Sequence, residues 1–477
     1  MSVDMTTQSL LVKQNWTKAG NAYEGDNPEG TVIDPTTYPR ATLSDITGTG
    51  KYQGAFKLPQ SSVRYSKGTM AIVDGGSSFF MTGNKTVTAN SIREFSVPAL
   101  VNEDTDVSLL NTATQLQASG NLSTGTTGTP DNTTFEQIEG LVYKDGTLYG
   151  NNYMGYDNGN HKGLSFTVTG LNDLSTATVK GLMAVDVSHG KMAASLSPIP
   201  NEWQSILGGD LLLSDGQEKS ITSRLSNGPS VFTLSSTDII TANAGDSLTT
   251  GKFADFPTSN RLVADFLNYE GSVGRVNNDL WTELSAVGFT FVVPGTRTIA
   301  VIGRSAGHMS EGSNPLSFTT GAAADLGAFT VVESGIAAVS PYAGTRSDNG
   351  VNSGNINGSI AYKDTLDTWV DSEGEKLGGY RVYNDHDNSA YYWLYDINDL
   401  VGLTNLYDAM PYDYGRFPTP FAKDNGNTDA SDNAGVYGGS IDPTTNKLYL
   451  SIAKANNSVD PKFRGDPVVA VYQLGGN

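Results

Sequence analysis

The segment Gly140–Asn152, GLVYKDGTLYGNN, indicates the fold class of this chain. Two short apolar runs flank Lys144-Asp145-Gly146, and an Asp-Gly step supplies the positive φ that a tight hairpin requires. The segment therefore predicts two antiparallel strands joined by a short turn. The same succession of strand, turn and strand recurs in Ala71–Asn84, Phe289–Arg304 and Gly439–Lys454.

A second pattern predicts a further strand in each unit. An aromatic residue opens an alternating run that ends in a polar residue, an Asp and an aliphatic residue, as in Phe166–Leu174, Phe232–Ile239 and Trp393–Leu400. Where both patterns follow one another, as in Leu141–Leu174, they form a module of three or four strands in about forty residues. So small a module cannot bury its own apolar face, so its copies must pack against one another.

These repeats predict an all-β, β-propeller-like fold with about six or seven blades of antiparallel strands and long loops. The strand near Tyr52 is expected to pair with the strand near Val471, which would close the ring and remove both sheet edges. Residues 1–48 lack a strong strand-pairing signal and are assigned to an N-terminal arm, whereas residues 49–477 are assigned to the propeller.

Composition excludes several kinds of function. The chain has 30 basic and 50 acidic residues, a formal charge of −20, and no Lys/Arg cluster that would bind a phosphate backbone or an anionic membrane surface. Cysteine is absent, which excludes disulfides, thiolate zinc sites and thiol catalysis.

No apolar run approaches the length of a membrane span. The N-terminus resembles no secretory signal, so a cytoplasmic protein or a virion component released by lysis is expected.

The order of several motifs resembles a group of uncharacterised propeller-like proteins encoded by bacteria and tailed bacteriophages. The resemblance covers most of residues 52–474 and rests on YQGAFKLP (Tyr52–Pro59), NSIREFSVP (Asn90–Pro98), the run Gly208–Leu234, VPGTRTIAVIGR (Val293–Arg304), YYWLYDINDL (Tyr391–Leu400) and GGSIDPTTNKLYLSIAKAN (Gly438–Asn456). These motifs are mainly structural. The resemblance therefore implies a propeller and a bacterial or phage source, and it carries no catalytic residues.

Candidate binding residues are aromatic or lie in the arm. Leu11 and Trp16 are predicted anchors if the arm docks on another chain; the alternative is that the arm wraps its own domain. Tyr412, Tyr414 and Phe417 lie in a loop, where exposed rings beside Asn and Asp suit sugar stacking or a protein interface. The opposing interpretation is that such rings belong to the core.

Candidate polar sites are sparse. Asp385 and Asp387 flank His386 and offer oxygen ligands to a hard cation such as Ca²⁺, although a polar turn explains the same residues. Glu136 and Glu139 precede a strand and represent the paired carboxylates of a glycosidase, which 50 acidic residues also supply by chance. No G-x-S-x-G motif supports serine catalysis.

The leading hypothesis from the sequence is a non-enzymatic bacteriophage virion protein, a head decoration or a tail-fibre or adhesion component. Its arm would anchor the propeller to other virion proteins, and its loop face would contact a host-surface glycan or a protein. A homo-oligomer is compatible with this role. The alternatives are a glycan-active hydrolase or lyase with carboxylates in the funnel of the ring, and a bacterial protein-binding scaffold.

Overall fold

The structure is a computed structural model of the chain. The described residues are 34–59, 69–82, 91–122, 137–153, 164–187, 195–216, 226–257, 259–262, 280–281, 285–305, 362–363, 369–370, 389–421, 435–456 and 466–475. Among them, no helix has the length and hydrophobicity needed to cross a membrane.

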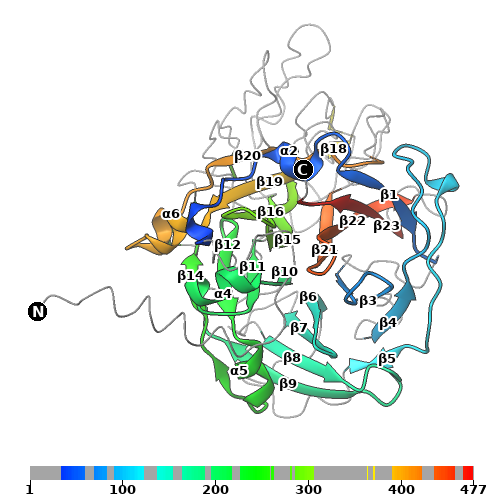
Figure 1. Ribbon diagram of the computed structural model, residues 1–477, viewed down its shortest axis with the longest axis horizontal. Helices are drawn as coiled ribbons and strands as arrows, with labels where there is room; N and C mark the ends of the chain where they lie inside the picture. Colours follow the sequence, from blue (N-terminus) through cyan, green and yellow to red (C-terminus); the bar gives the residue numbers. More distant parts are fainter. Residues whose placement is uncertain are drawn as a thin grey trace, which may run out of the picture.

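Five sheets of four or five strands form the blades of a ring in the described part of the chain (Figure 1). The first blade contains β2 (Met70–Ile72), β3 (Ser78–Thr82), β4 (Ser91–Ser96) and β5 (Gly120–Asn121). The second contains β6 (Gln137–Lys144), β7 (Thr147–Tyr153), β8 (Leu164–Thr169) and β9 (Thr178–Val185), with β13 (Ser247–Leu248) parallel to β9. The third contains β10 (Ser195–Pro198), β11 (Leu211–Asp215), β12 (Ser230–Leu234) and β14 (Gly251–Ala254).

The fourth blade contains β15 (Ala286–Val292), β16 (Thr298–Ser305), β19 (Ser389–Asp396) and β20 (Asp413–Arg416). The fifth contains β21 (Val436–Asp442), β22 (Lys447–Asn456), β23 (Asp466–Gln473) and β1 (Tyr52–Lys57). Each of the inner strands β2, β6, β10, β15 and β21 contacts the inner strands of both neighbouring blades. The blades therefore surround a common axis, as a propeller requires.

The expectation of six or seven blades is wrong, because segments far apart in sequence share one blade. Tyr391–Leu400 contains β19, which pairs with β16, so it supplies the third strand of the blade that the Phe289–Arg304 hairpin begins. The strand β9 adds no new blade, because it pairs with β8 of the second blade. Strand order within a blade depends on contacts that are distant in sequence, which local patterns do not record.

The predicted ring closure is confirmed. β1 pairs antiparallel with β23, with Tyr52 opposite Tyr472 and Phe56 opposite Val469. The N-terminal strand thereby becomes the outer strand of the blade that the C-terminal residues build. This pairing covers the edge that β23 would otherwise leave open.

Short helices follow two of the three strands that the second sequence pattern identified. α5 (Ser236–Thr241) follows β12, and the Ser235 side chain accepts a hydrogen bond from the Asp238 amide. α6 (Ile397–Val401) follows β19, and Asp396 accepts from the Asn398 amide. Such caps satisfy amides that have no partner within the helix. The remaining elements are α2 (Leu43–Thr47), α4 (Asn201–Leu207), η2 (Pro35–Thr37), η3 (Val107–Leu109), η8 (Leu406–Asp408) and the pair β17 (Tyr362–Lys363) and β18 (Trp369–Val370).

Apolar clusters fill the seams between neighbouring blades. At the axis, buried hydroxyl groups join adjacent inner strands. The Ser195 Oγ of the third blade accepts from the Thr290 amide of the fourth at 2.8 Å, and the Ser440 Oγ of the fifth accepts from the Ile72 amide of the first at 3.0 Å. The two donors are buried backbone amides of inner strands. Inner strands of neighbouring blades belong to different sheets, so these amides need the side-chain oxygens as hydrogen-bond partners.

Residues 34–41, here called the strap, lie along the fourth blade. The Asp396 carboxylate, which is almost fully buried, accepts hydrogen bonds from Arg40 and Arg297. The hydroxyl of Tyr412 donates to the carbonyl oxygen of Ala41 at 2.6 Å. Burial alone would raise the pKa of Asp396, but the hydrogen bonds from the two guanidinium groups outweigh it and hold that pKa below its ordinary value. The described part of the arm is therefore attached to its own propeller.

Candidate functional site

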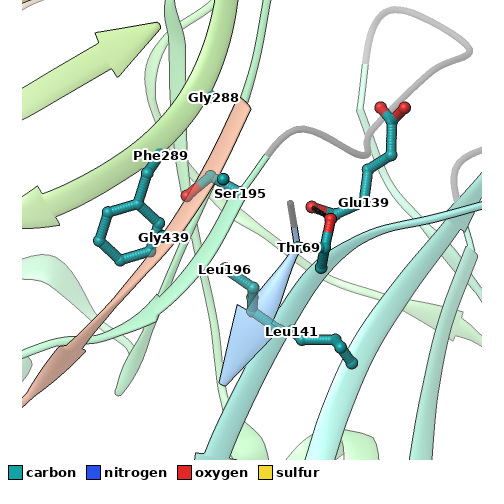
Figure 2. Close-up of a pocket in the computed structure, with 9 residues that line it drawn as sticks. Thr69, Glu139, Leu141, Ser195, Leu196, Gly288, Phe289 and Gly439 are labelled. Atoms are coloured by element: carbon teal, nitrogen blue, oxygen red, sulfur yellow. Dashed lines mark hydrogen bonds between the residues drawn. The ribbon is translucent and has the colours of Figure 1, made fainter. Parts of the chain in front are cut away.

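The candidate site lies on the propeller axis, at the end where the inner strands begin. We call this end the inner rim. It surrounds a narrow hollow, whose space between atoms is about 150 Å³ with the adjoining solvent included and which has no room for a water molecule. All five blades contribute to its wall through Thr69, Glu139, Leu141, Ser195, Leu196, Gly288, Phe289, Gly438 and Gly439 (Figure 2).

Three of the inner strands carry a β-bulge at the inner rim. The register of β6 with β7 passes over Glu139, that of β15 with β16 passes over Gly288, and that of β21 with β22 passes over Tyr437. A bulge leaves one residue out of the ladder and changes the direction of its side chain, and bulges are frequent beside functional sites. Glu139 and Tyr437 thus occupy equivalent positions in the second and fifth blades.

Glu139 is the carboxylate of the inner rim. Glu139 is only 6% exposed. Thr69 of the first blade lies beside it, and the Thr69 Oγ1 donates a hydrogen bond to the Glu139 carbonyl oxygen at 2.9 Å. Figure 2 shows the Glu139 carboxylate directed away from Leu141 and Leu196. The side chain is therefore anchored at its backbone, and its acidic group is directed away from the apolar wall.

Tyr437 and Arg304 form the second polar feature of the inner rim. The guanidinium carbon of Arg304 lies 4.5 Å from the centroid of the Tyr437 ring, which is a cation–π contact. Arg304 is near the end of β16, and Tyr437 is near the start of β21, so the pair lies across the seam between the fourth and fifth blades. The rim consequently presents an acid, an aromatic ring and a cation on rigid strands.

Buried polar side chains lie behind the two bulges that carry functional groups. Asn151 pairs with Gly140 and Ser451 pairs with Gly438, whereas the equivalent partner of Phe289, behind the Gly288 bulge, is the apolar Ile302. The Asn151 Nδ2 and the Ser451 Oγ have no hydrogen-bond partner. The Thr290 Oγ1, two residues after Gly288, also lacks a partner, so an unpaired buried polar atom lies near each of the three bulges.

The aromatic residues predicted from the sequence lie away from this rim, in and beside β20. Tyr414 is 39% exposed, so it remains a candidate for partner contact. Tyr412 is half-buried beneath the Arg40 guanidinium, and burial raises its pKa to about 12. Phe417 is 3% exposed and belongs to the core cluster at the seam of the fourth and fifth blades, so its ring offers almost no surface to a partner.

Other predicted residues lie outside the described ranges. Leu11 and Trp16 precede the strap, and Asp385 and Asp387 precede β19. Their roles as arm anchors and as calcium ligands stay predictions. Within the described part of the chain, no group of three or more His, Asp or Glu side chains is placed to hold a metal ion.

Sequence reasoning identified Glu139 but missed Thr69, Arg304 and Tyr437. A signal was present for two of the bulges, because Glu139-Gly140 and Tyr437-Gly438 both place a large side chain directly before a glycine at the start of an inner strand. The Cβ that an alanine would place at position 140 meets the Asn151 Nδ2 at 3.1 Å and the Leu196 Cβ at 3.2 Å. An alanine there would force these neighbours to shift by a few tenths of an ångström, so the site is closely packed around the glycine, which the sequence alone does not show.

Comparison with known proteins gives distant likenesses in structure. No protein-family model and no curated sequence matches the chain. A glycoside-hydrolase candidate from Parabacteroides distasonis is similar over 93% of this chain and 98% of its own, with 10% identity and a TM-score of 0.38. The WD40 β-propeller domain of Doa1 is similar over 90% of this chain and 98% of its own, with 8% identity and a TM-score of 0.27. A mannose phosphorylase from Leishmania mexicana is similar over 90% of this chain and 91% of its own, with 8% identity and a TM-score of 0.34. At these TM-scores the likenesses carry no argument about function.

Proposed function

We propose that the protein is a glycan-binding propeller that holds its ligand at the inner rim without converting it. The observation that carries this proposal is the placement of Glu139 and of the Arg304–Tyr437 pair on bulged or adjoining strands around one axis. A carboxylate accepts hydrogen bonds from sugar hydroxyls, a guanidinium donates to sugar oxygens, and an aromatic face packs against the C–H surface of a sugar ring.

The dimensions of the hollow favour binding at the rim over a reaction inside the ring. The hollow has no room for even a water molecule, whereas pockets that enclose small molecules have roughly 300–1,000 Å³. Glu139 is the one carboxylate among the residues that line it. Hydrolysis of a glycosidic bond ordinarily uses two carboxyl groups about 5–10 Å apart. The described wall, made otherwise of Gly, Ser, Thr and apolar residues, provides one.

A glycan hydrolase or lyase is the second candidate function, because Glu139 is a buried carboxylate beside a hollow. In that case Glu139 would act as the general acid or base. The second carboxyl group would have to come from residues other than those that line the described wall. Glu136, the partner that the sequence suggested, lies outside the described residues.

The test is a glycan-array screen followed by calorimetric titration of the best ligand with four proteins: wild type, Glu139→Gln, Tyr437→Ala and the distant surface control Leu109→Ala. Leu109 is 60% exposed and lies in η3, between β4 and β5, so its truncation should leave binding unchanged. We expect Glu139→Gln and Tyr437→Ala each to weaken binding about tenfold or more, as loss of a charge-assisted hydrogen bond or a ring contact does. Equal affinity in all four proteins would refute the proposed site.

Product analysis separates the two candidate functions. The same glycans are incubated with each protein, and reducing ends and unsaturated products are measured over a day. A binding protein leaves the glycan intact. Turnover that Glu139→Gln abolishes would instead establish the hydrolase or lyase.

We also propose that this binding serves a bacteriophage particle to which the arm attaches the propeller. The support comes from the sequence, through the resemblance to phage-encoded proteins and the predicted anchors Leu11 and Trp16. Mass spectrometry of purified particles from the source host tests this proposal, with copy number measured against the capsid protein. Absence from particles while the protein remains in the soluble fraction would overturn it.

A further inference from the structure

Thr69 contacts the Glu139 bulge from another blade. It precedes β2 directly, is 2% exposed, and lines the hollow together with Glu139. Its Oγ1 donates to the Glu139 carbonyl oxygen at 2.9 Å and lies 3.5 Å from that of Ile138. Thr69 is itself held by the first blade, where its carbonyl oxygen accepts from the Thr82 amide.

The contact acts on β6 at its bulge. The register of β6 with β7 shifts between Ile138 and Gly140, with Glu139 between them. A bulge bends the strand and changes the direction of a side chain, so contacts with the backbone of the bulge bear on where the Glu139 side chain points. The Thr69 hydroxyl supplies one such contact to the backbone of Glu139 itself.

We propose that Thr69 is a positioning residue for the glycan site, which fixes the Glu139 bulge across the seam between the first and second blades. The inference rests on the proposed function, since it assigns Thr69 a role in ligand affinity through Glu139. Binding at the rim thereby becomes dependent on the relative position of two blades. Thr69 does not need to touch the ligand.

Ser440 provides a matched control for this role. Its Oγ also joins two inner strands, since it accepts from the Ile72 amide at 3.0 Å, and it is 4% exposed. That bond links the fifth and first blades and reaches no bulge residue. Loss of Ser440 therefore weakens a seam without changing the direction of Glu139.

The experiment compares wild type with Thr69→Val, Thr69→Ser and Ser440→Ala. Valine keeps the shape of threonine and removes the hydroxyl, whereas serine keeps the hydroxyl. The first measurement is affinity for the glycan found by the array. We expect Thr69→Val to bind about tenfold more weakly, Thr69→Ser to bind within about twofold of wild type, and Ser440→Ala to bind as wild type although it unfolds more readily.

The second measurement is hydrogen exchange at the Glu139 and Gly140 amides, which needs no ligand. Faster exchange there in Thr69→Val, with wild-type exchange in Ser440→Ala, is the expected result. If the wild type binds no glycan, the proposed function fails, and exchange still decides the role of Thr69. Wild-type exchange and affinity in Thr69→Val would overturn the inference, as would equal effects of Thr69→Val and Ser440→Ala on both measurements. If Thr69→Val does not fold, Thr69→Ala is compared with Thr69→Ser in its place.

Discussion

Replacement of Phe56 by alanine tests whether β1 is an integral strand of the ring. Phe56 is fully buried in β1, lies opposite Val469 of β23, and packs across the seam against Phe79 of the first blade, with 5.6 Å between ring centroids. Removal of a phenylalanine side chain from a packed core costs about 3–5 kcal/mol. Folded domains are stable by about 5–15 kcal/mol, so this loss would be a large fraction of the total.

Urea unfolding followed by circular dichroism measures the change. The exposed control Leu109→Ala should lie within about 0.5 kcal/mol of wild type. A Phe56→Ala protein that loses less than about 1 kcal/mol would refute the reasoning, because β1 would then detach at little cost. A separate early transition with a small dependence on urea would show that β1 unfolds locally and that the ring does not act as one unit.

Two further predictions concern the strap and the packing of the fourth blade. Arg40→Gln removes one of the two cations that lower the pKa of Asp396. A carboxyl with a lowered pKa stabilises the fold above its unfolded pKa of about 3.9 and loses that contribution as the pH falls through its folded pKa. The difference between wild type and Arg40→Gln in urea midpoint should therefore be larger at pH 7 than at pH 2, and an equal difference at both would contradict this account. Gly303→Ala places a Cβ 1.9 Å from the Ala286 carbonyl oxygen and should prevent stable folding. Gly295 has φ +72° and open space around it, so Gly295→Ala should lower the free energy of unfolding by only about 1–2 kcal/mol. Thermal unfolding of both variants measures the contrast.

Much of the fold could be predicted from local pattern. The Asp145-Gly146 turn, with Asp145 at φ 50° and Gly146 at φ 76°, adopts the conformation that its residue types favour. The recurring exits of β12 and β19 were visible as a pattern, but the short helices there and their caps, Ser235 and Asp396, were not predicted. Blade number was not predictable, because the pairing of β19 with β16 joins segments separated by more than eighty residues. Hydrophobic periodicity identifies strands and does not identify their partners.

The candidate site was visible only in part. Glu139 stood out as an acid at the start of a strand, yet its location at the axis follows from ring closure. Arg304 and Tyr437 are separated in sequence by more than a hundred residues, and their contact exists because consecutive blades pack side by side. Thr69 was not identified, since a threonine before a short apolar strand has no chemical signature until its neighbour is known.

The pairing of β1 with β23 also determines when the protein can be completed during synthesis. Tyr52 lies opposite Tyr472, so the first strand waits for a partner that the ribosome makes some 420 residues later. At roughly 5–20 residues per second, that interval is about 20–80 s. During this time four blades can assemble, while the fifth lacks most of its strands and the ring stays open. The ring can therefore close only after β23 has been made, and a chain shortened to end before Asp466 would leave β1 without its partner.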